Sequence, residues 1–180
     1  MNCPLCGGTA KGIGEKNGYP MARCRDCAHL FAARHPAPEQ LAEHYRRYAY
    51  EENDLESVSP FVRGRLDEIS AGFDPFRRSG RLLEIGFGAG AMLRAAQERG
   101  WDVHGVEASD LAAEQARKNG FKKALKADFL EADYPDGHFD VVVAIELLEH
   151  VTAPAAFLRQ AARVLAPGGL LYMTTPNGAG

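Results

Sequence analysis

Short apolar runs alternate with segments of helical periodicity over the second half of the chain. From Arg81 onward the runs RLLEI, DVHGVE, KALKAD, FDVVVAI and GLLYMTT are separated by helical patterns over residues 91–100, 111–120 and 154–165. Such alternation is typical of a parallel sheet with helices on its faces. The run VVVAI is continuously apolar, as expected for a central strand that is buried on both sides. The sequence therefore predicts an α/β fold with five parallel strands.

Two further segments precede this region and differ from it in composition. Residues 1–35 contain few core-forming side chains, and the Pro-containing stretch HPAPEQ follows them. Residues 38–50 and 60–71 carry apolar side chains at helical spacing, namely Leu41, Tyr45 and Tyr48 in the first and Phe61, Val62, Leu66 and Ile69 in the second. We therefore expect a small N-terminal domain over residues 1–35, a helical linker over 36–79 and the α/β domain over 80–180.

All four cysteines lie in the first 27 residues, as the pairs Cys3–Cys6 and Cys24–Cys27 in two CxxC motifs. The N-terminal stretch lacks the basic and apolar regions of a signal peptide, which argues against a disulfide framework. Two CxxC pairs at this spacing are typical of a zinc ribbon, because four thiolates complete a tetrahedral shell. A closed shell has no open position, so the sequence predicts a structural zinc ion. Four unlinked thiols are the alternative.

The net charge of −3 is unevenly distributed. Residues 1–35 hold five basic and two acidic side chains, or +3, and the remainder holds 16 basic and 22 acidic ones, or −6. An acidic body argues against a nucleic-acid partner, although the basic N-terminal segment leaves that possibility open. The apolar runs are too short to span a bilayer. We therefore expect a cytoplasmic protein without a membrane span.

A glycine-rich turn follows the first strand of the predicted sheet. It reads Glu84-Ile-Gly86-Phe87-Gly88-Ala-Gly90 and leads into a helical pattern. Glycines let the backbone approach a ligand, and a helix N-terminus favours electron-rich groups. A turn that binds nothing is the alternative interpretation.

Acidic side chains follow the next two strands. Glu107 stands 21 positions after Gly86, where a carboxylate can bind both hydroxyls of a ribose. Asp128 and Phe129 suit an adenine, with a hydrogen bond to its exocyclic amine and a ring against its face. The alternatives are a solvated strand end for Glu107, a turn cap for Asp128 and a core position for Phe129.

Taken in order, these motifs resemble those of the class I S-adenosylmethionine-dependent methyltransferases. The resemblance covers residues 80–176 and includes the stretches DVVVAIELLEHV and RVLAPGG, and the cysteine-containing N-terminus resembles a bacterial subgroup of these enzymes. It implies a Rossmann-like sheet and S-adenosylmethionine as cofactor. The residues that it assigns to the cofactor are Glu84, Gly86, Phe87, Gly88, Gly90, Glu107, Ala108, Asp128, Phe129 and Glu146. Phe87 departs from the small residue common at this position, and we expect it to narrow the pocket.

The segment AIELLEHV places Glu146, Glu149 and His150 at spacings i, i+3 and i+4, which share one face of a helix. In the first interpretation Glu146 borders the cofactor, and the other two begin the next helix. In the second, Glu146 or His150 is a catalytic general base for a hydroxyl acceptor. In the third, all three bind Mg²⁺ or Mn²⁺, as the similar motif does in ubiquinone-pathway O-methyltransferases.

The family sheet has seven strands in the order 3-2-1-4-5-7-6, whereas five are found in this sequence. We therefore expect a truncated chain whose fifth strand is an exposed apolar edge, with edge-paired homo-oligomers as one consequence. The expected function is a transferase activity, S-adenosylmethionine-dependent methylation of a small molecule, and O-methylation above all. An RNA methyltransferase is one alternative, because certain ribosomal-RNA methyltransferases carry a zinc finger that opens with CPLC. A non-catalytic binding module is the other.

Overall fold

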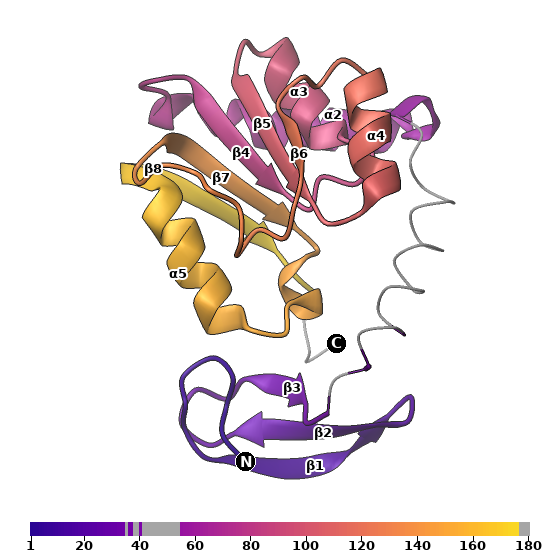
Figure 1. Ribbon diagram of the computed structural model, residues 1–180, viewed down its shortest axis with the longest axis vertical. Helices are drawn as coiled ribbons and strands as arrows, with labels where there is room; N and C mark the ends of the chain where they lie inside the picture. The colour runs from indigo at the N-terminus through magenta and orange to yellow at the C-terminus, as the bar shows by residue number, and fades with distance from the viewer. Residues whose placement is uncertain (35, 38–39, 41–54, 177–180) are drawn as a thin grey trace.

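A computed structural model describes residues 1–34, 36–37, 40 and 55–176 of the chain (Figure 1). The first helix expected from the sequence, over residues 38–50, lies outside these residues except for Gln40. The described part contains a three-stranded and a five-stranded sheet. Within it, no helix is both long enough and apolar enough to cross a membrane.

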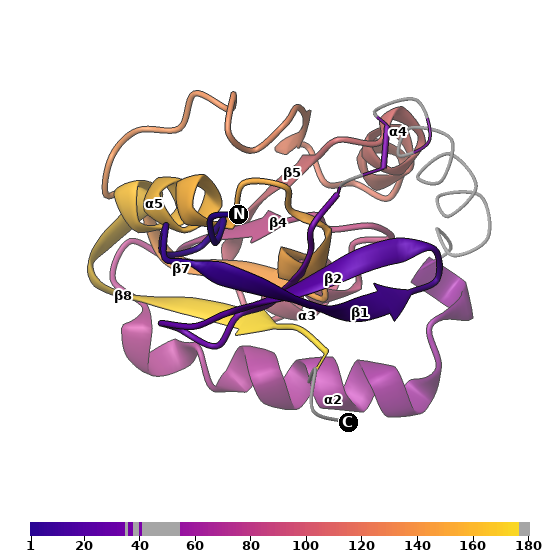
Figure 2. The ribbon, with the colours of Figure 1, turned by 90° about the horizontal axis from the view of Figure 1, so that it is seen from below.

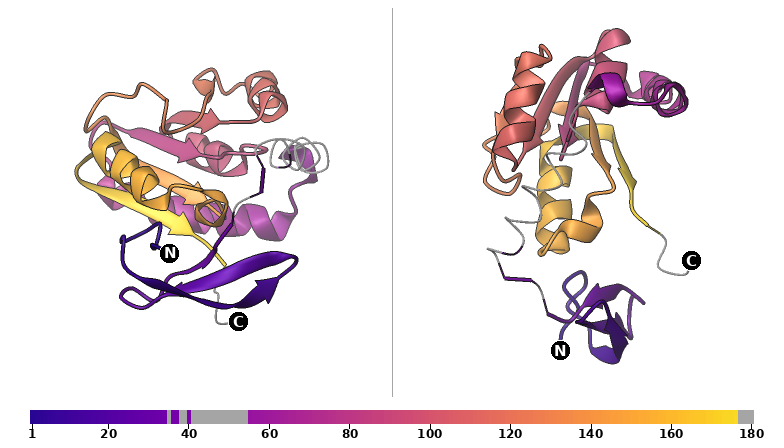
Figure 3. Two further views of the ribbon diagram at one scale, coloured as in Figure 1. Left: turned by 60° about the horizontal axis from the view of Figure 1, so that its bottom comes forward. Right: turned by 90° about the vertical axis from the view of Figure 1, so that its right-hand side faces the viewer.

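The N-terminal sheet is antiparallel and forms a body separate from the larger sheet (Figures 1 and 3). Its strands are β1 (Ala10–Lys16), β2 (Tyr19–Cys24) and β3 (Leu30–Ala32), in the order β1-β2-β3. The pairing of β1 with β2 shifts register between Gly12 and Gly14, which is the position of a β-bulge.

The larger sheet confirms the predicted α/β fold. Its strands lie in the order β6-β5-β4-β7-β8, and all four pairings are parallel. The elements are β4 (Arg81–Ile85), α3 (Ala91–Glu98), β5 (Asp102–Glu107), α4 (Asp110–Lys118), β6 (Ala124–Lys126), β7 (Phe139–Ile145), α5 (Pro154–Val164) and β8 (Leu165–Thr174). Of the five strands, β6 and β8 are the edges.

The two faces of this sheet carry separate apolar cores. Leu82, Val141 and Val143 face a cluster that includes side chains of α3 and α4. Leu83 and Val142 alternate with them and face a second cluster, which includes Phe157, Ala161 and Val164 of α5. Figure 2 shows α5 and α2 (Pro60–Ala71) on opposite sides of the sheet. Burial on both faces explains why the β7 sequence is continuously apolar.

Helix α2 forms where the sequence predicts it, and the Ser59 hydroxyl caps it by accepting a hydrogen bond from the Val62 N–H at 3.3 Å. The predicted apolar stripe is only half correct. Leu66 and Ile69 pack against the core, whereas the side chain of Phe61 is 83% exposed and that of Val62 is 43% exposed. At 3.6 residues a turn, Phe61 lies about 140° around the helix from Leu66 and so faces away from the core.

The 3₁₀ turns η1 (Leu55–Ser57) and η2 (Asp74–Phe76) flank α2, and a buried carboxylate then secures the entry into β4. Asp140 of β7 is 2% exposed, and its Oδ2 accepts hydrogen bonds from the backbone N–H groups of Arg78, Ser79 and Gly80 at 2.7–2.8 Å. The Ser79 hydroxyl donates to Oδ1 at 3.0 Å. Burial alone raises the pKa of a carboxyl, but these hydrogen bonds outweigh it and lower the pKa of Asp140.

We predict that Asp140→Asn lowers the free energy of unfolding by about 2–3 kcal/mol at pH 7, because charge-assisted hydrogen bonds are lost. The folded-state pKa lies below the unfolded value, so the carboxylate stabilises the fold above about pH 4. This stabilisation is lost as the pH falls through the lower, folded-state pKa. Urea unfolding at pH 7 and about pH 3 measures both effects, with the exposed Asp133→Asn as control. A difference between Asp140→Asn and wild type that does not shrink at low pH would contradict the account.

Candidate functional site

The glycine-rich turn joins β4 to α3 at the carboxyl end of the sheet. Gly86, Gly88 and Gly90 all have positive φ angles, of 69°, 49° and 81°. A Cβ on Gly86 would stand 3.0 Å from a Leu147 methyl carbon, and one on Gly90 would stand 2.7 Å from the Phe121 ring. No atom of the described residues lies within 4 Å of the Cβ position at Gly88. Two of the glycines are therefore needed for local packing, whereas Gly88 borders open space that a ligand can enter.

Glu107 ends β5 and bridges the glycine-rich turn to the start of α4. Its Oε2 accepts a hydrogen bond from the Gly88 N–H at 3.3 Å, and its Oε1 accepts one from the Ser109 N–H at 2.9 Å. The carboxylate is half-buried and held by backbone donors, so it is not a freely solvated strand end. Each oxygen keeps further acceptor capacity for a ligand hydroxyl. Ala108 is exposed between Glu107 and Ser109.

Glu84 is a buried acid two residues before Gly86. Its side chain is 4% exposed, and its Oε2 has no hydrogen-bond partner among the described residues. Burial, opposed in part by a backbone hydrogen bond from Leu93, raises the pKa of Glu84 well above the usual range. A buried polar atom without a partner is uncommon and costly, and a donor from a bound molecule would satisfy it.

The two residues expected at the adenine differ in exposure. Asp128 is exposed and its Oδ1 accepts a hydrogen bond from the Leu130 N–H at 2.8 Å, so it caps the turn after β6 (Ala124–Lys126). This capping leaves its other oxygen available. Phe129 is 5% exposed and packs edge-on against Phe157 of α5, with ring centroids 5.3 Å apart. Phe129 is therefore a core residue, which was the alternative interpretation, and its ring is buried rather than exposed for stacking against a base.

The expectation that Phe87 narrows the cofactor pocket is also wrong, because its ring points into the core. The side chain is 4% exposed and belongs to the core formed with α3 and α4. It lies against Gly105 of β5, where a Cβ would stand 2.5 Å from Phe87 Cδ1. The missing side chain at Gly105 therefore makes room for Phe87, a complementarity that the sequence does not reveal.

The AIELLEHV segment is not the helix face that its spacing suggests. Glu146 directly follows β7 with a φ of 47°, which is rare for a residue with a side chain. Its N–H donates to the backbone carbonyl of Thr174 at 3.0 Å and to the Thr174 hydroxyl at 3.1 Å. A single 3₁₀ turn, η3, covers only Leu148–His150. Glu146 therefore lies before the turn that carries Glu149 and His150.

Two threonines at the end of β8 are site residues that the sequence reasoning missed. Thr174 holds the backbone of Glu146, and the Thr175 hydroxyl donates to Glu149 Oε2 at 3.1 Å. Both lie at the carboxyl end of the predicted run GLLYMTT, where parallel strands bring their carboxyl ends together. The side chains of Glu146, Glu149 and His150 are all exposed. Among the described residues, these three side chains do not belong to any group of His, Cys, Asp and Glu whose ligand atoms lie close enough together to hold a metal ion.

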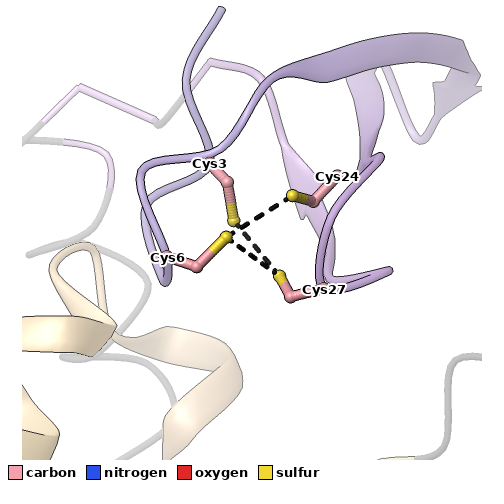
Figure 4. Close-up of side chains that lie close together, drawn as sticks. All are labelled: Cys3, Cys6, Cys24 and Cys27. Atoms are coloured by element: carbon pink, nitrogen blue, oxygen red, sulfur yellow. Dashed lines mark hydrogen bonds between the residues drawn. The ribbon is translucent and has the colours of Figure 1, made fainter.

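The four cysteines form the one such group in the described part of the chain, with sulfur atoms within 4.8 Å of one another. Figure 4 shows them converging from two loops. The Sγ–Sγ distances are 3.7 Å for Cys3–Cys27, 3.6 Å for Cys6–Cys24 and 3.3 Å for Cys6–Cys27. A tetrahedral zinc ion with Zn–S bonds of about 2.3 Å requires sulfur atoms about 3.8 Å apart. The thiols therefore fit a zinc ion after a small expansion.

Backbone geometry supports this cluster. Hydrogen bonds from the Cys27 and Asp26 N–H groups lower the pKa of the Cys24 thiol to about 7, which favours its thiolate. A backbone hydrogen bond from Gly8 is outweighed by the neighbouring Cys27 and Cys24 thiols, which raise the pKa of Cys6 to about 12. Gly8 lies so close to Asp26 that a Cβ would stand 1.9 Å from Asp26 Oδ2. Gly8, the second residue after the first CxxC motif, therefore leaves the space that the Asp26 side chain of the second loop occupies.

Residues 42–180 match the model of a methyltransferase domain family, so the chain belongs to that family. It is 38% identical over 128 residues to the 27-O-demethylrifamycin SV methyltransferase of Amycolatopsis mediterranei, covering 64% of this chain and 47% of the relative. It is 30% identical over 145 residues to the ubiquinone biosynthesis O-methyltransferase of Pseudomonas aeruginosa, covering 77% of this chain and 60% of the relative. The chain thus spans about half the length of the curated relatives it matches.

Solved structures share the fold. The [4+2]-cyclase SpnF superposes with a TM-score of 0.58 at 28% identity, covering 72% of this chain and 52% of SpnF. An S-adenosylmethionine-dependent methyltransferase from Mesorhizobium loti gives a TM-score of 0.51 at 25% identity, covering 61% of this chain and 55% of that one. Together with the strand order, these comparisons confirm the class I S-adenosylmethionine-dependent methyltransferase fold that the motifs predict.

We predict that Gly105→Ala lowers the free energy of unfolding by about 1–3 kcal/mol, because the new methyl group overlaps the Phe87 ring. Gly64→Ala is the matched control, since Gly64 lies in the exposed middle of α2 with nothing within 4 Å. That change should stabilise the chain by up to about 1 kcal/mol. Combining Gly105→Ala with Phe87→Leu should recover part of the loss in urea unfolding. Equal effects of the two alanine substitutions would contradict this packing.

Proposed function

We propose that this chain is the cofactor-binding part of an S-adenosylmethionine-dependent methyltransferase that O-methylates a small molecule. The observation that carries the proposal is the junction of the glycine-rich turn with Glu107. There, a loop that borders open space at Gly88 meets a half-buried carboxylate with free acceptor capacity. In a sheet of this order, ligands bind at the carboxyl ends of the strands where the order reverses, which here is at β4.

The residues present fit the cofactor. Glu107 would hold the ribose hydroxyls, and the turn from Gly86 to Gly90 would admit the methionine part. Asp128 would accept a hydrogen bond from the adenine amine, and the buried Glu84 would support the glycine-rich turn from the end of β4. S-Adenosylmethionine supplies an electrophilic methyl group when it is bound. The task left to the protein is to orient the acceptor and exclude water.

The choice of a small hydroxyl acceptor is supported by the names of the relatives, among them rifamycin and ubiquinone-pathway O-methyltransferases. Glu146, at the end of β7, would border the cofactor, and Glu146 or His150 would take the proton of a hydroxyl acceptor. Because SpnF shares the fold and is described as a [4+2]-cyclase, cofactor binding and methyl transfer have to be measured separately.

Other parts of the proposal rest on the sequence and on single features of the structure. They are a domain division at residues 35 and 79, a structural Zn²⁺ ion on the four cysteines, a cytoplasmic location, and homo-oligomers paired through the β8 edge. Support for the zinc ion comes from the spacing of the four sulfur atoms, and support for edge pairing from the position of β8 at the end of the sheet.

We predict that S-adenosylhomocysteine binds the wild-type chain and binds Glu107→Ala at least about tenfold more weakly, because hydrogen bonds to a charged group are each worth about 1.5–3 kcal/mol. Isothermal titration calorimetry measures both affinities. Glu131→Ala, which removes an exposed carboxylate from the loop after β6, should bind like wild type. A wild-type chain without affinity would refute the proposed function, and equal affinities of wild type and Glu107→Ala would refute the role of Glu107.

We predict that Mn²⁺ adds to the thermal stabilisation by S-adenosylhomocysteine if Glu146, Glu149 and His150 bind a divalent cation. Glu149→Ala should then abolish the Mn²⁺-dependent increment while leaving the shift produced by S-adenosylhomocysteine alone. Glu131→Ala again serves as the control. An increment of the same size in Glu149→Ala, or none in wild type, would reject the metal and leave Glu146 as a pocket residue.

We predict one zinc ion per chain, measured by mass spectrometry of the metal content. Cys6→Ser and Cys24→Ser should each lose zinc and unfold the N-terminal sheet, because the small domain depends on the metal for stability. Thr9→Ser, beside the cluster, should keep the metal. Titration with a mercurial reagent should release the zinc as the four thiols react. A zinc-free wild-type chain whose N-terminal sheet stays folded would contradict the assignment.

A further inference from the structure

The strand register gathers basic side chains on one face of the N-terminal sheet. Residues paired across neighbouring strands point to the same face, and successive residues of a strand point to opposite faces. Lys11 of β1 pairs with Arg23 of β2, and Arg23 pairs with Leu30 of β3. These three side chains therefore form one row across the sheet.

The bulge in β1 adds a second lysine to this face. Lys11 and Lys16 are five residues apart and would face opposite sides of a regular strand. Because the register shifts between Gly12 and Gly14, Lys16 pairs with Tyr19, which is on the same face of β2 as Arg23. Glu15, the acidic residue of these strands, is paired with Pro20 and points to the other face.

Further cations extend the face at both ends. Arg25 follows Arg23 by two positions and lies in the turn directly after β2, where its N–H donates to the Thr9 carbonyl at 2.9 Å. At the other end, Arg34 donates to the carbonyl of Gly18 in the β1–β2 turn. We call this surface the basic face and define it by residues Lys11, Lys16, Tyr19, Met21, Arg23, Arg25, Leu30 and Arg34.

The charges of the basic face have no counter-ions in the described part of the chain. All five basic side chains are exposed. Ion pairs occur between Arg65 and Glu68 of α2 and at positions in the larger sheet and its helices. Among the described residues, none involves the basic face. Like charges directly opposite each other, as at Lys11 and Arg23, destabilise a sheet. A bound polyanion would remove this repulsion.

We propose that the basic face binds single-stranded nucleic acid. From Tyr19 to Arg23 the face follows β2 for about 13 Å, and Arg25 lies in the turn directly after this strand, so the face suits a linear chain of phosphates rather than one small anion. Tyr19 and Met21 are half-buried between the cations and offer ring and thioether surfaces against which bases can stack. The −6 charge of residues 36–180 does not prevent this, because charges are screened beyond about 8 Å at physiological salt.

The proposal is independent of the methyl acceptor, because the basic face belongs to the N-terminal sheet and not to the cofactor site. Substitutions in the basic face also leave the side chains of the cysteine cluster in place. Cys24 lies between Arg23 and Arg25 in sequence, so its thiol points to the opposite face, and it pairs with Ala10 rather than with a basic residue.

The test is fluorescence anisotropy of a labelled single-stranded RNA of about 12 nucleotides with the zinc-loaded full chain, from about 50 to 200 mM salt. The variant Lys11→Gln/Arg23→Gln/Arg25→Gln should bind about tenfold or more weakly. It should also reduce the slope of log affinity against log salt by about 2, at about 0.7 for each lost phosphate contact. The control Arg117→Gln/Lys122→Gln/Arg159→Gln removes the same charge from exposed positions of the larger domain and should bind like wild type.

Metal content and thermal unfolding establish that each variant is folded. If the triple variant loses zinc, Lys11→Gln and Arg23→Gln are measured singly, and each should reduce the slope by about 0.7. Tyr19→Ala should weaken binding while Tyr19→Phe restores it. No binding by wild type, equal losses in the two triple variants, or binding to vesicles of phosphatidylserine and phosphatidylcholine without binding to RNA would each overturn the proposal.

Discussion

The reversal of strand order at β4 determines where a ligand can bind in this chain. β4 lies between β5 and β7, so the loops that leave β4 and β7 diverge to opposite faces of the sheet. The three positive-φ glycines then let the first of these loops turn sharply, with no side chain at Gly88. Asp140 secures the other end of β4 through three backbone N–H groups, so the loop starts from a fixed strand. The hydrogen bond between the Gly88 N–H and the Glu107 carboxylate depends on this arrangement.

The sequence predicts the elements of the sheet and their order closely, because burial on both faces leaves a strong apolar signal in β4 and β7. It also places Glu107 and the glycine-rich turn at one edge. It does not predict the direction of single side chains. Phe87 turns into the core because Gly105, distant in sequence, leaves space there, and Phe129 packs on Phe157 of a later helix. The spacing of Glu146, Glu149 and His150 suggests a helix, whereas the left-handed backbone at Glu146 interrupts it.

In the N-terminal sheet, too, the sequence does not predict the direction of the charged side chains. A count of residues gives a modest excess of basic side chains, but the register and the bulge in β1 place those of both strands on one face. Net charge therefore underestimates the local field. The chain combines a class I methyltransferase fold, with the Glu107 carboxylate beside its glycine-rich turn, and a separate sheet with basic side chains on one face.

The proposed function requires the junction of the glycine-rich turn with Glu107 to hold S-adenosylmethionine. A crystal structure of the chain with S-adenosylhomocysteine is the decisive measurement. We expect both ribose hydroxyls within hydrogen-bond distance of the Glu107 carboxylate, and the methionine part beside Gly86 and Gly88. A ligand bound elsewhere on the sheet, with Glu107 still bonded only to the N–H groups of Gly88 and Ser109, would contradict it.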